Sequence, residues 1–432
     1  MTWWSSLRRT CSVSSLVLVA LVVALPGWEA KAADWYLKGL LSETSLYNSN
    51  QQLKANSDGN VFGLLSTVNL DFGLRTPSFR IKAITGLSYN YYFGPGAMAD
   101  DFGPSGLNER NGFDFTIAGN AEYKRNIGPN TYNLSGFVVP EPTEISELTD
   151  SGKVTFDATR WSFGWNGGID HAVDPLNTLS LDAAQKWVRF VGSDSDEFTP
   201  YDSYSLAGIW KRRLSQRSDA TVSAGIVQST FGDSSGNTST TYYASTGFAA
   251  NLTKLLSVNA SVGGQYTDSE DDGTLSGAIW NFGFDYVMKR TAIAFDASQS
   301  VAPSSLGDVQ QTTALAVNIN HKVSPRLNLG ASYRIASSDQ SPELLDSQLI
   351  GASANYAINS LTNLSLNGSY NMFRADDDEN IMTLSATYGR ELIERLRGEL
   401  SYTFKYDDDS DEGVATSHAA YFRLSRPFDV FR

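Results

Sequence analysis

Charged side chains recur two residues apart in this chain. Arg80 and Lys82 form one pair, and Arg397 and Glu399 form another. In an extended segment, residues i and i+2 point to the same side, so each pair would present both of its charges to one face. Arg80 and Lys82 are the strongest candidates for a basic ladder on such a face.

The same alternation, followed along the chain, collects further charges on one polar face. If that face lines a pore, cations opposite carboxylates would create a transverse field that selects polar or anionic solutes. The alternative is that the charges pair across strands and only keep the interior wet. The expected pore-lining residues are Arg80, Lys82, Glu122, Lys124, Arg160, Lys211, Arg213, Asp285, Asp296, Arg334, Arg397, Glu399 and Lys405.

The sequence contains few residues in arrangements that could perform catalysis. The single cysteine, Cys11, excludes a disulfide framework and a cysteine-based metal cluster. The three histidines stand far apart and lack metal-ligand spacing. A Gly-x-Ser-x-Gly motif is absent, and the candidate hydroxyl–imidazole pairs combine His171 or His418 with Ser162 or Ser417. We therefore expect a protein that is not an enzyme, with no catalytic residues, no cofactor and no metal centre.

Three acidic runs stand out, at residues 268–272, 376–379 and 407–412. Their carboxylate oxygens could bind divalent cations. Alternatively, they are solvated loops that keep the surface soluble. None has an Asp-x-Asp-x-Asp-Gly pattern with a terminal Glu, so a dedicated calcium site is not expected.

The overall composition narrows the class of protein. The chain has 432 residues, 19% charged and 12% aromatic, with a mean hydropathy of -0.24 and a formal net charge of -14. It is too polar for a bundle of transmembrane helices, each of which needs about 20 apolar residues. It is too rich in aromatic residues for a disordered chain. Its acidity, without a basic patch, argues against a nucleic-acid partner.

Residues 1–32 have the features of a secretory signal peptide. Two arginines precede an apolar core of ten residues, Leu16 to Leu25, which is too short for a membrane anchor. A small-x-small cleavage site follows at Ala30 to Ala32. An uncleaved anchor is the alternative. We expect export of residues 33–432 to the cell outer membrane of a Gram-negative bacterium.

From Asp34 onward the hydrophobic pattern repeats every two residues, which indicates β-strands with two unlike faces. One example sets Phe79 and Ile81 against Arg80 and Lys82. One face of such strands is apolar and rich in rings, whereas the other carries polar, small and charged residues. No segment has a convincing helical pattern.

The connections alternate between short turns and longer polar loops. Thr76-Pro77 and Asp174-Pro175 are typical short turns, whereas residues 94–110 and 139–152 are long loops. Strict alternation of this kind is typical of transmembrane β-barrels, whose short turns face the periplasm. In the second half, similar strand units recur roughly every 35 residues, the length of one up-and-down hairpin with its connections.

We therefore predict that residues 33–432 form a single all-β domain, a transmembrane antiparallel up-and-down β-barrel of about 18–20 strands. The count falls to about 18 if residues 131–138 or another candidate is not a strand. A soluble β-sandwich is the alternative, but strands of about 12–15 residues exceed its usual length of about 5–6. In hydrocarbon, only a closed barrel pairs the backbone groups of every strand.

Aromatic residues near the expected strand ends indicate interfacial girdles. The last strand ends with Phe428 to Arg432, so that its final ring is penultimate, a partial match to the terminal aromatic residue of many bacterial barrels. The expected girdle residues are Tyr47, Tyr89, Tyr91, Tyr204, Trp210, Tyr266, Tyr286, Tyr333, Tyr402 and Tyr406.

A Leu-Thr-x-Leu-x-Leu-x-x-x-Tyr pattern runs from Leu361 to Tyr370 and leads into acidic residues and another alternating strand. Together with the stretch from Arg395 to Tyr406, it resembles the β-barrel porin-2 family of Gram-negative outer-membrane proteins. Trp35, followed by Glu43 and Asn48, is loosely similar to the opening of that family. The resemblance covers most of residues 34–432. It implies an association with exopolysaccharide secretion and no catalytic residues.

We expect an outer-membrane channel that passes polar solutes or exported polysaccharide. A barrel of this size encloses an aqueous lumen unless loops or a plug fill it. Loop 94–110 or loop 139–152 could fold inward as a constriction or lie over the rim. Few residues lie between the expected cleavage site and Trp35, which disfavours a receptor with a plug domain.

The alternative function is a structural or assembly barrel that partners a periplasmic component of an envelope secretion system. The expected partners are outer-membrane lipid and lipopolysaccharide, together with a periplasmic polysaccharide-export protein.

Overall fold

The computed structural model describes residues 34–431 except 51–52, 54, 56–58, 96–110, 143–157, 193–197, 233–236, 271–272, 305–306, 308, 340–343, 375–378 and 410–412. The expected signal peptide, residues 1–32, lies outside the described residues.

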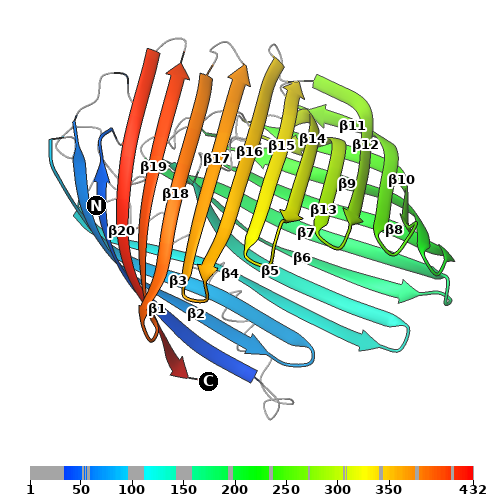
Figure 1. The fold of residues 1–432 in the computed structure, drawn as a ribbon. Coiled ribbons are helices and arrows are strands. Elements are labelled where there is room, and N and C mark those ends of the chain that lie inside the picture. Colours follow the sequence, from blue (N-terminus) through cyan, green and yellow to red (C-terminus); the bar gives the residue numbers. More distant parts are fainter. Residues whose placement is uncertain are drawn as a thin grey trace, which may run out of the picture.

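Twenty strands make up the fold (Figure 1). They are β1 (Asp34–Asn48), β2 (Val61–Arg75), β3 (Phe79–Phe93), β4 (Asn111–Ile127), β5 (Asn130–Pro142), β6 (Ala158–Ala172), β7 (Asn177–Gly192), β8 (Tyr201–Ser215), β9 (Ser218–Phe231), β10 (Thr238–Asn251), β11 (Leu256–Ser269), β12 (Gly273–Val287), β13 (Thr291–Pro303), β14 (Val309–Lys322), β15 (Leu327–Asp339), β16 (Leu344–Asn359), β17 (Thr362–Arg374), β18 (Glu379–Ile393), β19 (Leu396–Asp409) and β20 (Gly413–Phe431).

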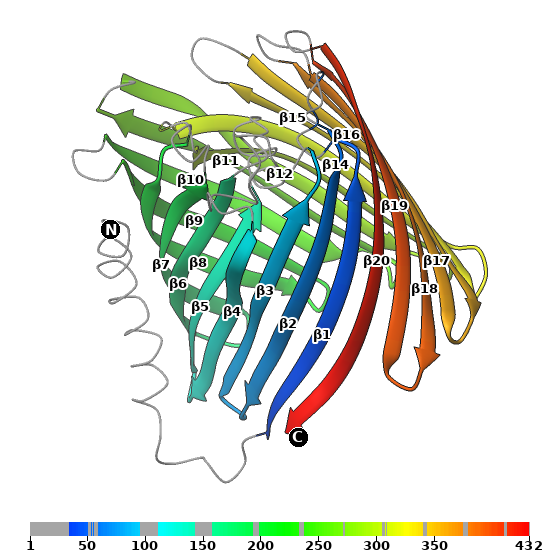
Figure 2. The same cartoon turned by 90° about the vertical axis from the view of Figure 1, so that its left-hand side faces the viewer.

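Each strand pairs antiparallel with the next strand along the chain, and β1 also pairs with β20. The sheet therefore closes on itself (Figure 2). This confirms the predicted all-β, antiparallel, up-and-down barrel, with the upper of the two expected strand counts. Closure leaves no edge strand around the ring.

Among the described residues, no helix is long and apolar enough to cross a bilayer.

The two ends of the barrel differ as the sequence predicts. The connections after β2 and β6 are short turns, at residues 76–78 and 173–176. The connections after β1 and β3 are longer, at residues 49–60 and 94–110. Because β1 starts opposite the end of β2 and β20 ends opposite the start of β1, the two ends of the barrel segment lie at the short-turn end.

The region around β5 differs in detail from the prediction. Residues 131–138, the least secure strand candidate, belong to β5, which continues to Pro142. The prediction that residues 139–152 form a loop is therefore wrong for its first four residues, which belong to β5 and pair with β6. Pro140 and Pro142 are tolerated there because they lie at the end of β5, where few backbone N–H groups are needed for pairing. The short turn before β5 was not predicted, and it depends on Gly128, whose φ of 59° suits glycine.

The turn between β6 and β7 is held by one carboxylate. Asp174 Oδ1 accepts hydrogen bonds from the amides of Leu176 and Asn177, at 2.7 and 2.8 Å. Asn177 Nδ2 donates to the other oxygen at 2.7 Å. These bonds favour the charged carboxylate and therefore hold the pKa of Asp174 below its usual range. The bond from the Asn177 side chain has the largest effect.

The two faces of the wall are distinguished by contacts that skip a strand. Arg397 Nη2 on β19 donates to Asn363 Oδ1 on β17 at 2.5 Å, past β18. Arg160 Nη2 on β6 donates to Tyr201 Oη on β8 at 2.8 Å, past β7. Side chains converge in this way on the concave side of a closed sheet and diverge on the convex side. The face that carries these residues therefore lines the central space.

The opposite, outer face is apolar and exposed. Phe115 is 58% exposed, Val262 59% and Leu400 56%, and each points outward by the register of its strand. A continuous apolar surface of this extent is unfavourable in water and suits a lipid environment. The register also places all ten expected girdle residues on this outer face.

The closing ladder between β1 and β20 includes one close side-chain contact. The ring of Phe428 covers Gly39, the residue opposite it on the outer face. A Cβ atom built on Gly39 would overlap the far end of the Phe428 ring, so a larger residue fits only if the ring moves. Next to this contact, the register shifts between Leu37 and Lys38. The final strand therefore closes the barrel with a ring that covers a glycine.

We predict that Gly39→Val impairs barrel closure, because the added side chain displaces Phe428. The cost of such overpacking is about 1–3 kcal/mol. The measurement is the urea midpoint of unfolding, followed by the heat-modifiable mobility of the folded barrel on gels.

Gly208 provides the matched control. It also lies on the outer face, on β8, but nothing lies within 4 Å of a Cβ atom built there. Gly208→Val should leave the midpoint nearly unchanged. Equal destabilisation by the two substitutions would contradict the role assigned to the Phe428 contact.

Candidate channel interior

The structure brings all the predicted charged residues to the inner face. The register of each strand pair, followed around the ring from Arg397 and Arg160, fixes the direction of every side chain. The residues on this face include Arg80, Lys82, Glu122, Lys124, Arg160, Lys211, Arg213, Asp285, Asp296, Arg334, Arg397, Glu399 and Lys405.

Several of these charges lie close to a carboxylate. Arg80 Nη1 is 3.9 Å from Glu122 Oε2, and both side chains are more than half exposed. Lys211 Nζ lies 3.1 Å from Asp219 Oδ2. Exposed pairs of this kind contribute little to stability. They bear out the alternative of cross-strand pairing for part of the set.

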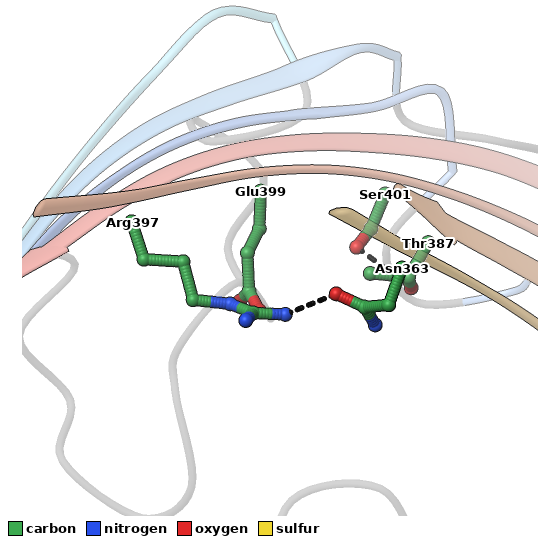
Figure 3. Close-up of polar contacts among 5 residues, drawn as sticks. All are labelled: Asn363, Thr387, Arg397, Glu399 and Ser401. Atoms are coloured by element: carbon green, nitrogen blue, oxygen red, sulfur yellow. Dashed lines mark hydrogen bonds and ion pairs between the residues drawn. The ribbon is translucent and has the colours of Figure 1, made fainter. Parts of the chain in front are cut away.

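Arg397 is held by two neighbouring side chains (Figure 3). Its Nε donates to Glu399 Oε1 at 2.8 Å while its Nη2 donates to Asn363. Thr387 and Ser401 share a hydrogen bond of 2.9 Å farther along the same wall. The side chains drawn in Figure 3 thus form a polar surface that spans β17, β18 and β19.

Lys82 differs from these paired cations. It faces Gly73 on β2 and Asn120 on β4, and within the described residues it makes no ion pair. Arg75 lies directly opposite Arg80. The inner face at the short-turn end of β2 to β4 therefore carries more positive than negative charge.

Sequence reasoning omitted several inner-face charges. Arg75 and Lys38 belong to the same face, and so do Asp170 and Asp182. The alternation rule that selected Arg80 could have found them.

Hydroxyl and amide side chains of the inner face also form cross-strand contacts. Asn259 Nδ2 donates to Asn281 Oδ1 at 2.6 Å, and Asn281 Nδ2 donates to Asp296 Oδ2 at 2.9 Å. Ser365 Oγ donates to Asn355 Oδ1 at 2.8 Å. The inner face therefore offers many groups that can exchange hydrogen bonds with water or with a polar solute.

The outer end of the β13–β14 hairpin leans into the barrel. Val309, the first residue of β14, packs against an apolar cluster of Val188, Tyr201 and Phe231 on the inner face of β7, β8 and β9. Strand β14 lies five strands beyond β9 around the ring, so this contact crosses the central space. It narrows the barrel near the long-loop end.

This constriction was not predicted. The loops expected to fold inward, 94–110 and 139–152, lie for the most part outside the described residues. A sequence signal did exist, because Pro303 at the end of β13 cannot donate to a neighbouring strand.

The candidate hydroxyl–imidazole pairs do not form. His171 and His418 lie on the outer face, whereas Ser162 and Ser417 lie on the inner face. His171 Nδ1 instead contacts Asn130 Oδ1, and His418 Nδ1 contacts Tyr402 Oη, each at 2.7 Å.

The described residues contain no group of three or more His, Cys, Asp or Glu side chains that could hold a metal ion. Much of the acidic runs at 376–379 and 407–412 lies outside the described residues.

The chain matches no known protein-family profile, and no curated protein matches it in sequence. Among solved structures it is similar to the apoprotein form of the FrpB iron transporter from Neisseria meningitidis (F5-1 variant). The identity is 8%, the TM-score is 0.51, and the match covers 91% of this chain and 81% of that one. It is also similar to a BenF-like porin from Pseudomonas fluorescens Pf-5, with 11% identity, a TM-score of 0.45 and coverage of 92% and 99%.

At these identities the comparison shows the fold alone. The chain shares the closed β-barrel fold of the FrpB transporter. Membership of the porin-2 family stays a prediction.

We predict that Val309→Ser widens the channel, because it weakens the apolar contact that draws the β13–β14 hairpin inward. Single-channel conductance in planar bilayers should rise roughly 1.2- to 2-fold. Ile84→Ser is the control, since Ile84 is also an inner-face apolar residue but lies on β3, away from the hairpin. An unchanged conductance for Val309→Ser would contradict the assigned constriction.

Proposed function

We propose that this protein is an outer-membrane channel for polar solutes. The observation that carries the proposal is the division of the closed wall into a polar inner face and an apolar outer face. An apolar exterior with aromatic girdles stabilises a barrel in a bilayer. A charged and hydrogen-bonding interior stabilises water within it. Together these two faces form a hydrated path across a membrane.

The distribution of inner-face groups favours solutes that combine hydroxyl groups with negative or no charge. The cations of β2 to β4 would attract anions entering from the short-turn end. The wall of β15 to β18 is rich in serine, threonine and asparagine, as the contact between Ser365 and Asn355 illustrates. Such groups exchange hydrogen bonds readily with sugar hydroxyls.

An exported polysaccharide is therefore the finer proposal for the transported molecule. The resemblance to porin-2 proteins supports it independently, as does the continuity of the hydroxyl and amide wall. In this role the short-turn end would face a periplasmic export partner.

Deletion of the gene should then abolish surface polymer. Normal surface polymer would leave a general channel for small polar solutes as the better assignment.

The primary test of channel function is conductance in planar bilayers. Purified protein should produce steady ion-conducting steps. Electrical silence, obtained with protein that is demonstrably folded and inserted, would count against an open channel.

We predict that Arg80→Glu combined with Lys82→Glu shifts the reversal potential toward cation selectivity. The substitution reverses two positive charges on the inner face of β3 and leaves Arg75 beside new carboxylates. The cation-to-anion permeability ratio should rise about threefold or more, measured in a salt gradient.

The control reverses two outward-facing cations, Arg125→Glu with Arg212→Glu, which alters the net charge equally. This variant should leave the reversal potential close to that of the original protein. Equal shifts in the two variants would attribute the effect to net charge and would contradict a pore-lining role for Arg80 and Lys82.

A further inference from the structure

The ladder between β12 and β13 is the shortest in the barrel. It contains eight residue pairs and ends at Trp280 and Gln299, although β12 starts at Gly273 and β13 ends at Pro303. Residues 273–279 and 300–303 therefore face each other without pairing. We call this opening the β12–β13 seam.

The seam opens because β13 and β14 leave the wall together. These two strands stay paired with each other up to Pro303 and Val309. A Cβ atom built on Gly277 of β12 would overlap the side-chain oxygen of Gln311 on β14, so the outer end of β14 lies against β12. The inward lean that forms the constriction thus also separates β13 from β12.

A cavity of about 280 Å³ lies behind the seam. A cavity of about 150 Å³ suffices for a benzene ring, so this one has room for a larger apolar group. None of its lining residues is charged, which disfavours an ionic ligand. Apolar walls come from Val227, Ile279, Val301 and Val309, whereas Thr241, Gln265 and Asn281 supply polar groups.

One polar group in this cavity is buried without a partner. Gln265 is 8% exposed, lines the cavity, and its Nε2 has no hydrogen-bond partner among the described atoms. Leaving a buried donor unsatisfied is unfavourable by about 1–3 kcal/mol. A ligand with an acceptor oxygen at this position would remove that cost.

The seam lies at the long-loop end of the barrel, which faces the outer leaflet when the short-turn end faces the periplasm. Tyr266, an outward girdle residue on β11, pairs with Ser276, which lies within the unpaired stretch of β12. Trp280 closes the lower end of the seam on the outer face, where its Nε1 donates to Gln299 Oε1 at 2.6 Å. In the proposal below, a molecule from the outer leaflet would enter the cavity through the unpaired stretch between the two strands.

We propose that the seam cavity binds an uncharged amphiphile from the outer leaflet. Its alkyl chain lies between β12 and β13, and its oxygen-bearing head accepts a hydrogen bond from Gln265 Nε2. The apolar part of the lining supports the alkyl chain, the lack of charged lining residues supports an uncharged ligand, and the unpaired amide supports the oxygen-bearing head. The proposal rests on the placement of the barrel in a bilayer but not on conductance.

The test uses an alkyl β-D-glucoside with a photoreactive diazirine on the chain carbon nearest the sugar. The full barrel is incorporated in lipid nanodiscs, illuminated with the probe, and mapped by mass spectrometry. We expect adducts on the inner-face residues Val227, Tyr243 and Ile279. Adducts on outward residues such as Phe282 serve as the internal control for membrane placement.

Two variants sharpen the result. Ser298→Trp fills the cavity and should reduce inner-face labelling about tenfold. Ala294→Trp is its matched control, since Ala294 lies on the same face of β13 but outside the cavity, and labelling should persist. Gln265→Leu removes the proposed donor and should reduce labelling about threefold to tenfold.

Labelling confined to outward residues would overturn the proposal, because it would show that the head remains outside the barrel. So would inner-face labelling that Ser298→Trp leaves unchanged. Absence of labelling on outward residues as well would instead contradict the membrane placement, so failure of this proposal and failure of the proposed function are distinguishable.

Discussion

The structure depends on the pairing of backbone amides and carbonyls in a setting without water. A strand in hydrocarbon must satisfy its polar backbone on both sides, and a closed antiparallel ring provides this for every strand. Closure of β1 against β20 is therefore the contact on which the rest depends. Beside the register shift in this ladder, the ring of Phe428 packs over Gly39, where there is no side chain to displace it.

Once the ring is closed, the two-residue period of each strand determines the chemistry of both faces. The facing of a side chain depends only on its position within its strand, which is local information. For this reason the sequence pattern was sufficient to assign Arg80, Glu122 and Lys405 to one face. The turn between β6 and β7 was predictable for a similar reason, because Asp174 forms the bonds that define it. The turn at Gly128 lacks such a side chain and was not predicted.

The features that could not be predicted are those that depend on distant strands. Alternation does not reveal how far two strands stay paired, so the early end of the β12–β13 ladder was not foreseen. It also does not reveal that Val309 meets Phe231 across the central space. Nor does it separate paired cations from unpaired ones, since the contact of Arg397 with Asn363 skips a strand.

Pairing is incomplete at the outer ends of the β4–β5 ladder, which stops at Gly119 and Val138, and of the β12–β13 ladder. The position of the β12–β13 seam explains why incomplete pairing is tolerated there. The ladder is intact along the lower part of both strands and opens only toward the outer rim, near Tyr266 and Ser276. Pro303 offers no amide donor, so the end of β13 loses one fewer hydrogen bond when it separates from β12. The apolar contact of Val309 with the opposite wall compensates in part for the lost pairing. A barrel can therefore exchange a few ladder bonds for an inward-leaning hairpin, and this exchange creates both the constriction and the cavity.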